Sequence, residues 1–107
     1  MNRTKVFRTK EDLESALSDN PIRVLRIGEQ KVCIAKHDDT FFAFQHLCPH
    51  QKHPLKEGLI TDFGEIVCPL HEYRFNLKSG ICVNQKCSDL ITYQIEIESQ
   101  GAFINLK

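Results

Sequence analysis

The sequence lacks several features that would place it in a large functional class. It has no excess of one charge, because its 14 Lys and Arg residues balance its 14 Asp and Glu residues. Nucleic-acid binders normally carry a strong basic excess, so this balance argues against a nucleic-acid partner. No apolar run approaches the roughly 18 residues of a membrane-spanning helix. The N-terminus also lacks the apolar core of a secretory signal, so we expect a soluble cytoplasmic protein.

Internal repeats, low-complexity segments and linkers are also lacking, and 107 residues suit one domain. We therefore expect a single domain over residues 1–107, present as a monomer. The five cysteines are an odd number, which excludes a fully paired disulfide framework. Cys33 and Cys82 stand in apolar runs, and we expect both to be buried free thiols.

The pattern of apolar residues predicts an all-β fold with one short N-terminal helix. Thr9 is a candidate helix N-cap, and acidic residues follow it in the first turn, where the helix dipole favours them. Apolar segments at 23–27, 31–36 and 41–45 are separated by turn residues, as in an antiparallel meander. Apolar and polar residues alternate over 91–98, and a further strand is expected at 102–106. The expected architecture is an antiparallel β-sandwich or partly open barrel.

Residues 46–90 contain most of the proline and histidine in the chain. Function tends to lie on such loop-rich segments, which a regular scaffold holds in place. We interpret this stretch as an inserted subdomain that presents the functional site. Within it, the apolar pairs at 59–60 and 66–67 flank a turn, which predicts a hairpin.

Two short motifs in this subdomain each combine a cysteine with a histidine. Cys48-Pro49-His50 is followed by seventeen residues and then by Cys68-Pro69-Leu70-His71. Two thiolates and two imidazoles suit a structural zinc ion, and they also suit a [2Fe–2S] core in which two His replace two Cys on one iron. The usual zinc-finger pattern places the two Cys together and the two His together, whereas here they alternate. Spacing therefore separates the two chemistries only in part.

The two motifs, with the stretch 73–80 that follows the second, resemble the ligand loops of Rieske-type ferredoxins, and the similarity covers roughly residues 22–106. The resemblance implies a Rieske-type [2Fe–2S] cluster, in which each loop gives its cysteine to one iron and its histidine to the other. The implied ligands are Cys48, His50, Cys68 and His71. The resemblance also implies a non-catalytic electron carrier that works between a reductase and an acceptor such as an oxygenase.

The sequence matches the oxygenase-associated branch of the family better than the respiratory branch. His53 and Leu70 stand where respiratory Rieske proteins have two cysteines that form a disulfide. Phe75 stands where those proteins have a tyrosine hydroxyl that donates to the cluster. Glu72 follows the second ligand histidine, where the family usually has glycine. We do not expect His46 or His53 to be cluster ligands.

Three other functions fit the same pattern of residues. They are a Rieske-like small subunit of a reductase complex, a redox sensor with the same cluster, and a zinc-stabilised interaction module. A visible absorption spectrum separates iron–sulfur from zinc, and stable co-purification with a large subunit would indicate a reductase complex.

The missing hydroxyl at Phe75 leads to a prediction about the reduction potential. Fewer hydrogen bonds to the cluster sulfurs stabilise the reduced, more negative state less. We expect the potential, measured by spectroelectrochemical titration, to fall at the low end of the roughly −150 to +300 mV range of Rieske centres. A potential well above the middle of that range would contradict this expectation.

Overall fold

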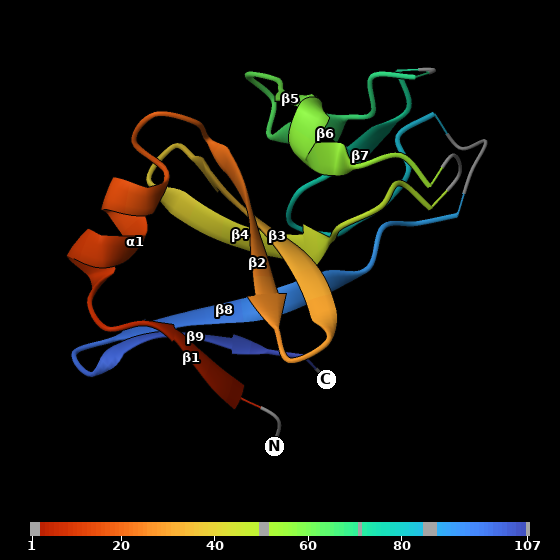
Figure 1. Cartoon of the computed structure of the whole chain (residues 1–107). Helices are drawn as coiled ribbons and strands as arrows, with labels where there is room; N and C mark the ends of the chain where they lie inside the picture. The colour runs from red at the N-terminus through yellow and green to blue at the C-terminus, as the bar shows by residue number, and fades with distance from the viewer. Residues whose placement is uncertain (1–2, 50–51, 71, 85–87, 107) are drawn as a thin grey trace.

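The computed structural model describes residues 3–49, 52–70, 72–84 and 88–106. Its strands form two antiparallel sheets of unequal size, with one short helix near the N-terminus (Figure 1). This arrangement confirms the expected all-β architecture. Within the described ranges, no helix combines the length and the apolar character needed to cross a membrane.

The larger sheet has six strands in the order β1-β9-β8-β4-β3-β2. They are β1 (Arg3–Phe7), β2 (Ile22–Ile27), β3 (Gln30–His37), β4 (Thr40–Gln45), β8 (Thr92–Glu98) and β9 (Gly101–Asn105). Strands β2, β3 and β4 form the predicted meander, because β3 pairs with β2 on one side and with β4 on the other. Only two residue pairs, Ala43 with Tyr93 and Phe44 with Thr92, join β4 to β8. The sheet is therefore nearly divided at this point, as expected for a partly open barrel.

The helix α1 (Lys10–Ala16) begins where the sequence predicts, because the Thr9 side chain accepts a hydrogen bond of 3.0 Å from the backbone N–H of Asp12. Its one fully buried residue, Leu13, packs with Ile34 and Ile104 of the larger sheet. The helix thus closes a hydrophobic cluster that lies away from the predicted metal site.

Strand β1 was not predicted, and polar contacts at the end of the larger sheet explain its position. Arg3 donates to Glu96 at 2.8 Å and to Glu98 at 2.7 Å on β8. Its guanidinium also lies 3.9 Å from the ring centroid of Phe103 on β9. These contacts span more than 90 residues of sequence, so no local pattern could reveal them.

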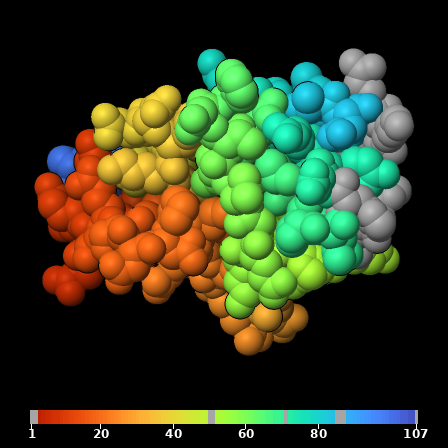
Figure 2. Space-filling view, turned by 90° about the horizontal axis from the view of Figure 1, so that it is seen from above, coloured from red at the N-terminus to blue at the C-terminus, as the bar shows by residue number. Residues whose placement is uncertain are grey.

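The smaller sheet lies between β4 and β8 in the sequence and contains β5 (Leu59–Ile60), β6 (Glu65–Val67) and β7 (Arg74–Asn76). A short 3-10 helix, η1 (Leu55–Glu57), precedes it. The pairing of β5 with β6 confirms the predicted hairpin, whereas β7 was not predicted. In Figure 2 the green to light-blue residues of this region gather at one end of the visible face, and the orange residues of the scaffold lie beside them.

A second hydrophobic cluster joins the two sheets. It contains Phe44 of the larger sheet, Ile66 and Phe75 of the smaller sheet, and both Cys48 and Cys68, all without exposed surface. The scaffold therefore reaches the predicted site through direct packing.

Candidate metal centre

The first predicted ligand loop begins at Cys48, three residues after the end of β4. The backbone N–H of Cys48 donates to the carbonyl of His53 at 2.8 Å, and the N–H of Lys52 donates to the carbonyl of Cys48 at 2.7 Å. Lys52 has φ = 54°, a left-handed conformation that few residues other than glycine adopt. These contacts fold the chain back on itself directly after the cysteine.

The second predicted ligand loop begins at Cys68, directly after β6, and repeats the same arrangement. The N–H of Cys68 donates to the carbonyl of Tyr73 at 2.9 Å, and the N–H of Glu72 donates to the carbonyl of Cys68 at 2.9 Å. Glu72 has φ = 58°, at the position that corresponds to Lys52. The two segments therefore share one backbone frame, in which the cysteine bonds to residues four and five positions later.

The structure brings the two predicted cysteines together in one cluster of buried residues. Cys48 and Cys68 are both 0% exposed. The other two predicted ligands, His50 and His71, lie outside the described residues. The structure therefore places the sulfur half of the predicted site.

The chemistry of these donors fits an iron–sulfur group. Among the described residues, no group of three or more His, Cys, Asp or Glu side chains could hold a metal ion. Cys48 and Cys68 offer two sulfurs in one buried cluster, and two sulfurs are the set that a Rieske centre requires at one of its irons. Cys33 belongs to the same cluster of buried residues, but burial raises the pKa of its thiol to about 12 against a smaller lowering by Lys56. Cys33 lies inside β3 and does not begin a loop, so it does not share the backbone frame of Cys48 and Cys68.

Two further histidines lie close to the first loop. Burial lowers the pKa of His46, and the positive charges of Lys31 and Lys56 lower it further. The His46 Nδ1 atom is buried and has no hydrogen-bond partner within the described ranges. The His53 ring contacts Glu57, with 2.8 Å between Nε2 and Oε1.

A third loop, at 81–89, follows β7, and its described residues are held by side chains that bond to backbone N–H groups. The Asp89 carboxylate accepts from the N–H of Cys82 at 2.9 Å, and the Asn84 amide oxygen accepts from the N–H of Arg74 at 2.8 Å. Cys82 is buried but disulfide-bonded, so the expectation of a free thiol is wrong for this residue and right for Cys33. Apolar neighbours predict burial, but they do not predict whether another thiol lies within reach. Cys87 lies outside the described residues.

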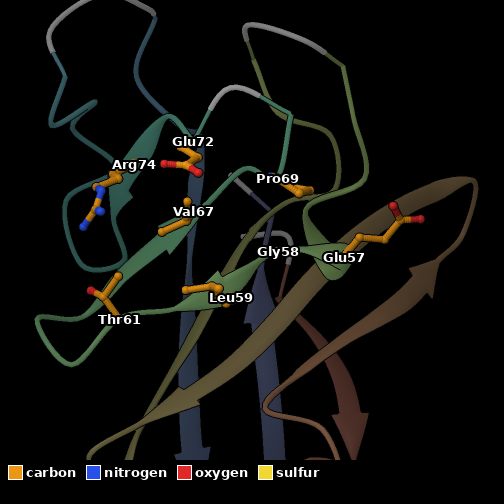
Figure 3. Close-up of a pocket in the computed structure, with 8 residues that line it drawn as sticks. All are labelled: Glu57, Gly58, Leu59, Thr61, Val67, Pro69, Glu72 and Arg74. Atoms are coloured by element: carbon orange, nitrogen blue, oxygen red, sulfur yellow. The ribbon is translucent and has the colours of Figure 1, made fainter.

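A hollow opens between η1, β5 and the second loop (Figure 3). Its lining residues are Glu57, Gly58, Leu59, Thr61, Val67, Pro69, Glu72 and Arg74. At one side of it, Gly58 lies against β6 so closely that an added Cβ would overlap the carbonyl oxygen of Val67. Because Val67 directly precedes Cys68, this contact between backbones helps to place the second loop.

The sequence analysis missed several residues that shape the site. Glu57 contacts His53 at the end of the first loop, Asn84 and Asp89 of the third loop accept from backbone N–H groups, and Lys52 adopts a left-handed conformation. Asn and Asp in a loop are common partners of backbone N–H groups, so Asn84 and Asp89 carried a usable signal. Nothing local in the sequence marks Glu57 as the partner of His53.

Comparisons with known proteins agree with this geometry. The model of the Rieske [2Fe-2S] domain family matches residues 6–94. The ferredoxin component of an alkene monooxygenase system from Xanthobacter autotrophicus is 33% identical over 82% of this chain and 72% of its own length. Human apoptosis-inducing factor 3 is 30% identical over 82% of this chain, which spans only 14% of that protein. The solved ferredoxin of carbazole 1,9a-dioxygenase from Nocardioides aromaticivorans superposes with a TM-score of 0.80 over all of both chains at 20% identity, and so supports the fold.

The left-handed conformation of Glu72 leads to a test by substitution. A side chain in this conformation costs about 1 kcal/mol relative to glycine, so we expect Glu72→Gly to be more stable than Glu72→Ala by about that amount. Both variants remove the carboxylate, and their difference therefore reports the backbone alone. Urea unfolding of the two proteins measures it, and an alanine variant as stable as the glycine variant would contradict the assigned conformation.

Proposed function

This chain belongs to the Rieske [2Fe–2S] domain family, and on that premise we propose that it carries one electron from a reductase to an oxygenase. The family is defined by its [2Fe–2S] cluster, which is the cofactor of this chain. The cluster supplies one-electron redox chemistry, and the chain acts as a carrier rather than as a catalyst. The observation that carries the proposal is the pair of matched loops, each of which begins at a buried cysteine.

We propose that Cys48 and Cys68 bind one iron and that His50 and His71 bind the other. The shared backbone frame supports equivalent roles for the two cysteines. Both cysteines are buried among apolar residues, and this supports a site that water does not reach through the protein interior. The alternation of cysteine and histidine in the sequence supports a ligand set divided between two irons.

The surface around the loops supports transfer to a protein partner. Each loop exposes apolar side chains, namely Leu47 and Leu70 beside the two cysteines and Ile81 and Val83 in the third loop, at 38–55% exposure. Exposed apolar groups gathered around one site are typical of protein contact surfaces. A partner that covers these groups would shorten the path for the electron.

We also propose the finer organisation that the sequence suggests. Residues 1–107 would form one domain, with the cluster-binding subdomain at about 46–90, and would act as a monomer in the cytoplasm. The smaller sheet and the three loops all fall between the end of β4 and the start of β8, which supports these subdomain limits.

Electron transfer to an oxygenase is the direct test of this function. We expect the reduced protein to give up one electron per chain when it is mixed anaerobically with an oxidised Rieske oxygenase in a stopped-flow instrument. Protein lacking the cluster serves as the control and should transfer nothing. A protein that stays reduced with oxygenases but changes its affinity for another macromolecule would be a sensor instead.

The proposed sulfur ligands can be tested against the third buried thiol. We expect Cys48→Ser and Cys68→Ser to lose the visible absorption and the bound iron. Cys33→Ala should keep about two irons per chain, because Cys33 lies on β3, outside both ligand loops. Iron and acid-labile sulfide assays on the three purified variants measure the difference. Loss of iron in Cys33→Ala alone would refute the assignment.

A further inference from the structure

The two ligand loops share a backbone frame but differ in the residue that closes it. In the first loop the closing residue is His53, whose carbonyl accepts the N–H of Cys48. The His53 ring also reaches out of the loop, because its Nε2 lies 2.8 Å from Oε1 of Glu57 on η1. One residue therefore binds the cysteine by its backbone and the neighbouring helix by its side chain.

The direction of this hydrogen bond follows from the chemistry of its partners. An ionised carboxylate can only accept, so Nε2 carries the proton and donates. Both the neutral Nε2–H tautomer and the protonated ring can donate in this way.

The 3-10 helix η1 is a firm anchor for this contact. Its first residue, Leu55, is 0% exposed, and the Leu55 N–H donates to the carbonyl of His46 at 2.9 Å. Its cap, Gly58, lies against the carbonyl of Val67, the residue before Cys68. Glu57 thus lies on a packed segment that touches the strands leading to both cysteines.

We propose that His53 is a positioning residue that ties the end of the first ligand loop to η1 through Glu57 and slows the release of the bound cluster. This proposal rests on the proposed function, because it requires the cluster to be bound there. The His53 side chain is 25% exposed and that of Glu57 is 54% exposed, so their contact adds little to the stability of the whole fold. The contact instead slows the local opening of the first ligand loop.

The test measures how fast the cluster leaves variants of the holoprotein. Visible absorbance is followed with an excess of an iron chelator, and EPR line shape is recorded on the reduced proteins. We expect His53→Ala and Glu57→Ala each to shorten the half-life of the cluster roughly two- to tenfold, the factor that corresponds to one lost hydrogen bond. The double variant should lose its cluster no faster than the faster single variant, because both substitutions break one contact.

Two controls isolate the contact. Glu57→Gln keeps an acceptor oxygen for the His53 ring and should keep a half-life near that of the wild type. Lys56→Ala removes the exposed neighbouring side chain on η1 and should also have no effect. Urea unfolding should give similar midpoints for Glu57→Ala and Lys56→Ala, which shows that the change is local.

The outcomes separate this proposal from the proposed function. Wild-type protein that binds no cluster would refute the proposed function. A wild type that binds the cluster while Glu57→Ala retains it as well as Lys56→Ala would refute the role of His53 alone. Strictly additive effects of the two alanine substitutions would also refute it, since each would then act independently. If His53→Ala does not fold, the other three variants still test whether the His53–Glu57 contact slows cluster release. They are Glu57→Ala, Glu57→Gln and Lys56→Ala.

Discussion

The backbone hydrogen bonds that turn the chain directly after Cys48 and Cys68 are the constraint on which the site depends. The backbone N–H of each cysteine donates and its carbonyl accepts within its own loop, so main-chain contacts fix the backbone from which the thiol extends. The turn requires a left-handed residue four positions later, and the chain uses Lys52 and Glu72 there despite the strain. Repetition of this frame in two segments of the chain places in matching positions the two cysteines that we propose as ligands of one iron.

The rest of the fold holds these two turns side by side. Strand β4 leads into the first loop and β6 into the second, and the cluster of buried residues that contains both cysteines also contains Phe44 of the larger sheet. The short helix η1 lies between the loops in the sequence and packs against β6 through Gly58. The loops are therefore supported from both sheets, while the apolar side chains around them stay exposed for a partner.

Local patterns predicted the elements that depend on local physics. The Thr9 cap, the β2–β4 meander and the β5–β6 hairpin follow from capping, alternation and turn residues, and all three are present. Strand β1 depends on a distant partner, β9, which a single sequence does not reveal. The proposed site was inferred from its residue types, because cysteine and histidine in paired motifs have few uses other than metal binding. The shared backbone frame and the His53–Glu57 contact became visible only in the three-dimensional structure.

The central claim is that the two irons have different ligands, sulfur from Cys48 and Cys68 on one and nitrogen from His50 and His71 on the other. Mössbauer spectroscopy of protein enriched in ⁵⁷Fe, before and after reduction, tests this most directly. The account predicts two distinct ferric sites in the oxidised protein, and only the histidine-bound site should become ferrous on reduction. Two indistinguishable iron sites, or a colourless protein that holds a single divalent ion, would contradict it.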